Sequence, residues 1–410
     1  MAKAPSSSIG ALAAARSFAL SKRKDEFENI RVKMTSENMR ESLPHVSSGS
    51  IIVDYLIGGL KNSFGVAPCP GFPRGRVSQI WGHEGSGKTS LALSTAAQVC
   101  REGGSVLYID WENDIVPDYA MALGVPVTDE NKFELLQPES LEDGIKYAMI
   151  YAANKVDLIV FDSVGAAVPR RLSTRDGAEA AEQGKVGEAQ AVWSQELPNL
   201  KRLIARSGTA IIGISQTRAE INTMGYGAKK DKPQGGNAWK FFSSVRLELK
   251  RGDYEYAKEV DVVTRKVEDK IVGALIKVTA IKCKMSRSQG RVEQYYLKIG
   301  HGIDNIRSIL EIAIAHGLVK KGGAGWTTWV KSDGSAVKVQ GIEKLRQYMV
   351  DNPEDYNFLE TAMMPLLGTG EAPTTFACSD DPDDDDNEDE DEDSSEKLLA
   401  SIRAKMEEDD

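Results

Sequence analysis

Gly82-His83-Glu84-Gly85-Ser86-Gly87-Lys88-Thr89 fits the pattern G-x-x-x-x-G-K-[ST] at every fixed position. An apolar run, 77–81, precedes it and a helix-forming run, 90–93, follows it, which is the strand–loop–helix context that a phosphate-binding loop requires. In such loops backbone N–H groups and the helix N-terminus bind phosphate oxygens, the lysine reaches the β- and γ-phosphates, and the last hydroxyl ligates Mg²⁺. The alternative is a chance glycine-rich turn. The sequence predicts nucleotide contacts from Gly82, Glu84, Gly85, Ser86, Gly87, Lys88, Thr89 and Ser90.

The bulk composition is that of an ordinary globular protein. The 410 residues are 41% hydrophobic and 27% charged, which is enough chain for two or three domains. No apolar run is long enough to span a membrane, and the N-terminus lacks the layout of a signal peptide. The four cysteines are scattered without metal-ligand spacing, which favours a reducing, cytoplasmic setting.

The net charge of −10 is unevenly distributed. Residues 371–410 contain 18 acidic and three basic side chains, a charge of −15, so the other 370 residues carry +5. A mildly basic body with an acidic tail is compatible with a polyanionic partner but does not establish one. The acidic run 380–393 cannot bury apolar surface, so we expect the tail to be disordered.

Apolar runs alternating with helical patterns predict the fold. The runs 76–82, 105–110, 157–162 and 209–215 are almost continuously apolar, as expected for parallel strands covered on both faces. The runs 243–250, 275–284 and 292–299 alternate more, which indicates an antiparallel extension of the sheet. We therefore expect an α/β fold with a P-loop ATPase core and a mostly parallel central sheet.

The sequence pattern predicts four parts of the chain. Residues 1–45 contain an amphipathic pattern at 9–33, which predicts an N-terminal helix that packs either on another subunit or on its own domain. Residues 46–305 form the ATPase core, within which 45–75 is expected to be turns around short apolar pieces. Residues 306–376 form a small α+β lobe with helices at 306–319 and 341–350, and 377–410 form the acidic tail.

Three strands end in polar side chains that suit phosphate chemistry. Asp162 ends the run 158–161, where an aspartate in a P-loop protein completes the Mg²⁺ site opposite Thr89. Glu112 follows the run 106–109, and because parallel strands end at the same edge it can polarise a water against the γ-phosphate. Gln216 follows 211–215 and can contact the γ-phosphate. The alternatives are a strand-to-turn boundary for Asp162, an N-cap or surface acid for Glu112, and a satisfied polar strand end for Gln216.

Two long loops beside this edge carry cations among small residues. The loop 169–187 contains Arg170, Arg171, Arg175 and Lys185. The loop 218–236 contains Arg218, Met224, Tyr226, Lys229, Lys230, Lys232, Gly235 and Gly236. Each loop alone indicates only solvent exposure. Two of them next to a nucleotide site predict elements that bind a nucleic acid backbone.

Taken together, these segments resemble the bacterial RecA recombinase family over roughly residues 45–350. Besides the phosphate loop, the family's D-A-E and V-D-S-V motifs correspond to 110–112 and 161–164, and its N-Q-I-R motif corresponds to 215–218. Its G-G-N-A-L-K-F signature corresponds to Gly235-Gly236-Asn237-Ala238-Trp239-Lys240-Phe241. The last two motifs are highly diagnostic, because a generic ATPase has no reason to carry them. The resemblance implies a RecA-like core.

The resemblance also implies roles for individual residues. Glu112 would be the catalytic base, Gln216 the γ-phosphate sensor, and Tyr119 the residue that stacks on adenine. Lys240 and Phe241 would lie at a subunit interface. Lys282 and Lys284 match a lysine pair that reaches the neighbouring subunit's ATP; two outward-facing strand lysines are the alternative. The two basic loops would be the DNA-binding loops, and the acidic tail would restrain DNA access.

Departures from the family pattern indicate a divergent member, of the kind a phage encodes. Val116 stands where an acid before Pro117 contacts the adenine, which leaves base selectivity open. Trp111 replaces a small residue beside Glu112, Val186 stands where the family prefers methionine, and 60–75 reads as an insertion.

These observations predict an ATP- and Mg²⁺-dependent recombinase that forms a helical filament on single-stranded DNA and exchanges strands with a homologous duplex. Nucleotide would lie between protomers, with no membrane involved and with loader or single-strand-binding proteins as possible partners. One alternative is a hexameric helicase with the same ATPase core. The other is an ATP-gated scaffold that coats DNA without exchanging strands.

Overall fold

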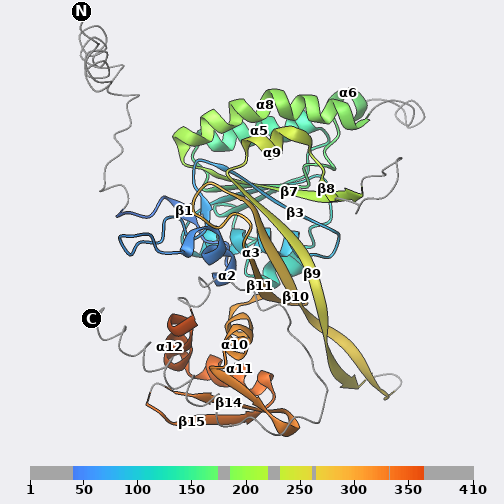
Figure 1. Ribbon diagram of the computed structural model, residues 1–410. Helices are drawn as coiled ribbons and strands as arrows, with labels where there is room; N and C mark the ends of the chain where they lie inside the picture. The colour runs from blue at the N-terminus through green and yellow to red at the C-terminus, as the bar shows by residue number, and fades with distance from the viewer. Residues whose placement is uncertain (1–39, 174–184, 220–230, 261–264, 332, 364–410) are drawn as a thin grey trace, which may run out of the picture.

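The computed structural model describes residues 40–173, 185–219, 231–260, 265–331 and 333–363 (Figure 1). Their central element is a ten-stranded sheet. Its strands are β3 (Val77–Gly82), β4 (Val106–Asp110), β5 (Phe133–Leu136), β6 (Leu158–Asp162), β7 (Ala210–Ala219), β8 (Asp231–Pro233), β9 (Val245–Val260), β10 (Val267–Cys283), β11 (Val292–Lys298) and β12 (Gly302–Asp304). The order is β12-β11-β10-β9-β3-β7-β6-β4-β5, with β8 paired to β7.

The middle of the sheet is parallel, which confirms the predicted fold class. β3 pairs with β7, β7 with β6, β6 with β4 and β4 with β5, all in parallel. Every residue of β3, β4 and β6 is buried. Their continuous apolar runs therefore reflect helices on both faces. The short edge strand β5 had no separate signal in the sequence.

The prediction that the antiparallel extension begins at 243–250 was wrong. β9 pairs with β3 in parallel, and only its pairing with β10 is antiparallel, as are the pairings of β11 and β12 that follow. The helix α9 (Gly236–Phe242) precedes β9, and a helical crossover returns the chain in the same direction. The β9–β10 hairpin continues well beyond the sheet as a twisted ribbon (Figure 1).

Helices cover the two faces of the sheet with separate apolar cores. On one face lies α3 (Lys88–Arg101), near the short helices α2 (Ile51–Asp54), η2 (Tyr55–Gly59) and α4 (Pro117–Ala122). On the other lie α5 (Leu141–Ala153), α8 (Lys185–Ser207) and α9, with α6 (Arg170–Ser173) near the end of α8. The stretch 45–75, predicted to be turns around short apolar pieces, is partly helical, because Ser50 caps α2 and the apolar run after it is buried. Its ends pair as β1 (His45–Val46) and β2 (Phe72–Pro73).

A smaller lobe follows the sheet, below it in Figure 1. It contains α10 (Asn305–Ala315), β13 (Val319–Gly322), η3 (Gly323–Gly325), β14 (Trp326–Val330), β15 (Ala336–Gln340), α11 (Ile342–Asp351) and α12 (Pro353–Met363). The three strands form an antiparallel sheet, as the predicted small α+β lobe requires. The exact division into residues 46–305 and 306–376 stays a prediction.

Arg307, on α10, ties this lobe to the hairpin. Its guanidinium contacts Glu311 at 2.7 Å, Glu343 of α11 at 2.9 Å and Glu255 of β9 at 3.0 Å. Its side chain is 8% exposed, so it is a mostly buried cation that carboxylates from three elements neutralise.

In the part of the chain that the structure describes, no helix is long and apolar enough to cross a bilayer. The helix predicted at 9–33 and the acidic tail at 377–410 lie outside the described residues.

Candidate functional site

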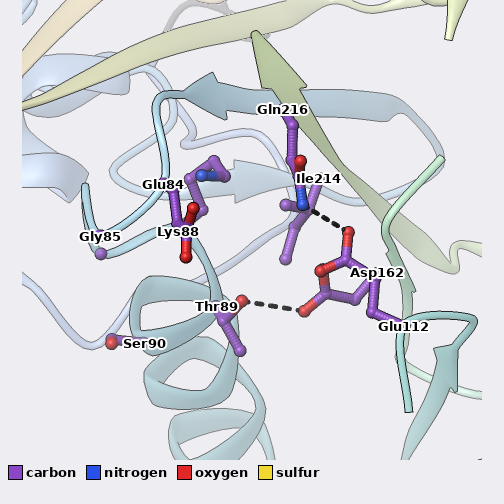
Figure 2. A pocket seen from close by; sticks show the side chains of 10 residues that line it. Glu84, Gly85, Lys88, Thr89, Ser90, Glu112, Asp162, Ile214 and Gln216 are labelled. Atoms are coloured by element: carbon purple, nitrogen blue, oxygen red, sulfur yellow. Dashed lines mark hydrogen bonds between the residues drawn. The ribbon is translucent and has the colours of Figure 1, made fainter. Parts of the chain in front are cut away.

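A pocket of about 200 Å³ opens at the edge where β3, β4, β6 and β7 end (Figure 2). It is lined by Glu84, Gly85, Gly87, Lys88, Thr89, Ser90, Glu112, Asp162, Ile214 and Gln216. These side chains come from segments that are far apart in the sequence and that only the parallel sheet brings together. Ligands of open α/β sheets bind at this carboxyl edge.

The phosphate loop connects β3 to α3 through glycines that other residues would not replace without strain. Gly85 and Gly87 have φ angles of 68° and 82°, in the left-handed region. Ser86 Oγ and Lys88 Nζ each donate a hydrogen bond of 2.7 Å to the carbonyl oxygen of His83. Lys88 begins α3, so the first N–H groups of that helix lie beside the lysine ammonium.

The predicted metal-binding residues contact each other directly. Thr89 Oγ1 donates to Asp162 Oδ2 at 3.0 Å, and Tyr108 donates its hydroxyl to the same oxygen at 2.7 Å. Asp162 is 4% exposed, and this burial raises its pKa to about 6, against the lowering effect of the Tyr108 hydrogen bond. A buried carboxylate of this kind gains most from a neighbouring cation.

The charged form of Lys88 is disfavoured by burial in the same way, but an anion rather than a cation would stabilise it. It is 8% exposed, and burial lowers its pKa, although Asp162, Glu112 and Glu84 act to raise it. A carboxylate and a hydroxyl supply the hard oxygen ligands that Mg²⁺ takes, and the lysine and helix N-terminus supply an anion site. The described residues contain no cluster of three or more His, Cys, Asp or Glu side chains that could hold a metal ion. The donor set therefore fits Mg²⁺ bound together with nucleotide phosphates, whose oxygens would complete its coordination.

Glu112 is held by two donors at the pocket wall. Gln216 Nε2 donates to Glu112 Oε1 at 2.8 Å, and Ser163 Oγ donates to the same oxygen (Figure 2 shows the first of these bonds). The turn that carries Glu112 is organised by Asp110, whose Oδ1 accepts from the backbone N–H of Glu112 at 3.0 Å and of Asn113 at 2.9 Å. Residues from three neighbouring strand ends thus fix the position of one carboxylate.

Tyr119, predicted to stack on adenine, lies on α4 next to the start of α3. Its hydroxyl is 2.6 Å from Ser90 Oγ, and the tyrosine is partly buried. The bond places the ring near the phosphate loop. Its stacking role stays a prediction.

Apart from Gly235 and Gly236, the predicted DNA-binding residues fall into three groups. Arg170 and Arg171 are described and form ion pairs, Arg170 with Asp143 and Arg171 with Glu188 at 2.5 Å. The backbone of Lys185 begins α8, that of Arg218 lies next to the last residue of β7, and that of Lys232 is the middle one of the three residues of β8. Arg175, Met224, Tyr226, Lys229 and Lys230 lie outside the described residues.

Gly235 and Gly236 end the second predicted loop and begin α9. Their φ angles are 95° and 78°, so both positions require glycine. An added Cβ at Gly235 would meet Val164 Cγ2 at 2.6 Å, and one at Gly236 would meet Gln190 Cγ at 2.6 Å. The glycines therefore let the chain pass close to the turn after β6 and to α8.

The lysine pair and the predicted interface residues lie together, away from this pocket. Lys282 Nζ donates to the carbonyl oxygens of Lys240 at 2.9 Å and of Phe241 at 3.2 Å. The Phe241 side chain is 67% exposed, and Lys284 is exposed as well. Neither lysine lines the pocket of its own chain. This arrangement is compatible with a site completed by a neighbouring subunit, which stays a prediction.

Sequence reasoning missed an aromatic cluster that underlies the site. Trp111 stacks on Phe161 with ring centroids 5.6 Å apart and an interplanar angle of 13°. Trp193 of α8 meets both rings edge-on, and Trp239 of α9 meets Trp193 at 5.0 Å and Phe161 at 6.0 Å. The residues that precede Glu112 and Asp162 are thus packed against both helices that follow the predicted DNA-binding loops. Trp111, Phe161 and Trp239 lie within the motifs quoted above, but no motif indicates that their rings contact one another and Trp193.

Tyr108 and His83 were also missed. Tyr108 reads as one apolar residue of a buried strand, but its hydroxyl reaches Asp162. His83 occupies a variable position of the phosphate loop, but its ring Nδ1 lies 3.0 Å from Thr217 Oγ1.

Comparisons with known proteins agree with this geometry. Residues 14–303 match the family model of the RecA N-terminal domain. The chain is 33% identical over 358 residues to Protein RecA of Nocardioides sp., covering 86% of this chain and 91% of that protein. It is 34% identical over 315 residues to Protein RecA of Limosilactobacillus reuteri, covering 77% of each chain. Protein RecA of Borrelia hermsii is 32% identical over 350 residues, covering 84% of this chain and 88% of that protein.

Proposed function

Because this chain belongs to the RecA family, as a divergent member, we propose that it is an ATP- and Mg²⁺-dependent DNA recombinase of recombination and repair. It forms a helical filament on single-stranded DNA and catalyses homologous pairing and strand exchange. The observation that carries the proposal is the 2.8 Å bond between Glu112 and Gln216 in the pocket that contains Lys88. It joins the residue suited to hydrolysis to the strand that leads toward residues 220–230.

In this proposal each pocket residue has a distinct part. Lys88 and the first N–H groups of α3 bind the β- and γ-phosphates. Thr89 and Asp162 hold Mg²⁺, which when bound neutralises charge on the phosphate oxygens. Glu112 accepts a proton from the attacking water, and the bonds from Ser163 and Gln216 keep its carboxylate oriented.

DNA and neighbouring subunits complete the proposed mechanism. The loops 169–187 and 218–236 bind the single strand, and Gln216 passes the state of the γ-phosphate to the second loop. Lys282 and Lys284 reach the nucleotide of the adjacent protomer across the surface that exposes Phe241. Hydrolysis then depends on filament assembly, by the logic of an arginine finger.

Two variants of the full chain, Lys88→Ala and Glu112→Gln, test the proposed function. Both are assayed for strand exchange between a single-stranded circle and a homologous linear duplex. We expect Lys88→Ala to lose ATP binding and strand exchange. Glu112→Gln should keep ATP-dependent DNA binding and lose hydrolysis by about 10²- to 10⁴-fold, the usual contribution of a general base.

The two other candidate functions predict different outcomes. A hexameric helicase would form closed rings rather than open helical filaments when imaged with single-stranded DNA and ATP. A scaffold that only coats DNA would bind it without exchanging strands. Strand exchange that survives in Lys88→Ala would refute the proposed function.

A further inference from the structure

His83 links the phosphate loop to the strand pair β7–β8 without passing through Glu112. It follows Gly82, the last residue of β3, and Thr217 follows Gln216 on β7. Gly82 and Gln216 are the last paired residues of these two parallel strands. The ring of His83 and the hydroxyl of Thr217, 3.0 Å apart, therefore join the two chains at the point where they separate.

Each end of this bond belongs to an element with a separate partner. On one side, the His83 carbonyl oxygen accepts from Lys88 Nζ and Ser86 Oγ, both at 2.7 Å. On the other, Thr217 pairs with Pro233, so β7 and β8 are joined where the chain leads into and out of residues 220–230. His83 thus contacts both the lysine of the phosphate loop and the strand that enters the predicted DNA-binding loop.

We propose that His83 is a positioning residue that couples nucleotide binding at the phosphate loop to DNA binding through Thr217. The inference rests on the proposed function and adds to it a second route beside Gln216. Coupling between two ligands is reciprocal, so the hydrogen bond contributes equally to the effect of nucleotide on DNA affinity and of DNA on nucleotide affinity. One neutral hydrogen bond stabilises by about 0.5–1.5 kcal/mol, which corresponds to a change of about two- to tenfold in affinity.

The chain permits a clean test because each partner has a matched variant. Thr217→Val removes the hydroxyl and keeps the β-branched shape, whereas Thr217→Ser keeps the hydroxyl. His83→Ala removes the ring and keeps the backbone carbonyl that Lys88 and Ser86 contact. The ratio of DNA affinities with and without a non-hydrolysable ATP analogue is measured by the fluorescence anisotropy of labelled oligo-dT. This ratio reports coupling, which a merely structural hydrogen bond would not change.

We expect Thr217→Val and His83→Ala each to reduce the coupling ratio by about two- to tenfold. Thr217→Ser should keep the wild-type ratio, and the double variant should lose no more than either single variant. Additive losses, an unchanged ratio in Thr217→Val, or equal losses of DNA affinity with and without the analogue would each overturn the role of His83. A wild-type protein whose DNA affinity ignores the analogue would overturn the proposed function as well. The two failures are therefore distinguishable.

Discussion

Gly213→Ala tests whether the aromatic cluster leaves space for even one added methyl group. Gly213 lies in β7 with its Cα against the ring of Trp239, which is fully buried. An ideal Cβ there would lie 2.2 Å from Trp239 Cζ3 and 2.4 Å from Cη2, far inside the ~3.5 Å at which carbon atoms pack. The ring cannot move freely, because Trp193 and Phe161 pack against it at centroid distances of 5.0 and 6.0 Å.

The expected cost of this substitution is that of overpacking, about 1–3 kcal/mol of unfolding free energy. Gly187 provides the matched control, because it lies exposed in α8 and an added Cβ would meet no atom within 4 Å. Gly187→Ala should instead raise the free energy of unfolding by about 0.5–1 kcal/mol, since alanine has a higher helix propensity than glycine. Urea denaturation followed by circular dichroism measures both values.

A second substitution identifies the cause of the loss. Phenylalanine lacks the outer ring of tryptophan, whose atoms make the clash. Trp239→Phe should therefore destabilise the wild-type chain but cost less in the Gly213→Ala background. If Gly213→Ala is as stable as the wild-type protein, or if Trp239→Phe costs the same in both backgrounds, the packing described for β7 and α9 is incorrect.

Three further predictions concern buried charges. Tyr108→Phe removes a hydrogen bond that stabilises the ionised form of Asp162, so the pKa of Asp162 should rise above about 6. The acid limb of the pH profile of Mg²⁺-dependent ATP hydrolysis should therefore move to higher pH. An acid limb at the wild-type pH or at lower pH would contradict this assignment. Because the folded-state pKa of Asp162 is raised, its contribution to stability is fully present below about pH 3.8 and is lost as the pH rises through about 6. Asp162→Asn should therefore make the unfolding temperature of the metal-free protein less dependent on pH across this range. Arg307→Met leaves the buried Glu311 carboxylate without its cation and should lower the free energy of unfolding by about 3–5 kcal/mol. The double variant Arg307→Met/Glu311→Leu should recover most of this loss. Equal thermal denaturation of Arg307→Met and the wild type would exclude this account.

Much of the pocket could be predicted because its chemistry is local in sequence. The phosphate loop is one continuous motif, and Glu112, Asp162 and Gln216 each follow an apolar run. Parallel strands end at the same edge, so one rule placed all of them near Lys88, and the structure has them lining one pocket. The roles of these residues stay predictions, but the sequence alone was enough to predict that they lie close together.

The rest depended on which segments lie side by side. The periodicity of 243–250 correctly indicates a strand, but a strand's partner and direction depend on the connection that precedes it, here α9. Trp193 and Trp239 read as ordinary core residues, because their mutual contact joins two side chains that are 46 positions apart in the chain. The bond from His83 to Thr217 was equally hidden, because His83 occupies a variable position of the phosphate loop and Thr217 replaces the isoleucine of the N-Q-I-R motif.

Lys282 illustrates how much a single chain can explain of a site that we propose to be shared between subunits. Its ammonium already has two acceptors in its own chain, the carbonyl oxygens of Lys240 and Phe241 at the end of α9. Burial lowers its pKa, and the nearby Lys284 ammonium lowers it further. An anionic phosphate from a neighbouring protomer would favour the charged form of Lys282, so this lysine gains more from that ligand than an isolated surface lysine would. The two bonds therefore attach Lys282 to the end of α9, the helix that also carries Trp239 of the aromatic cluster.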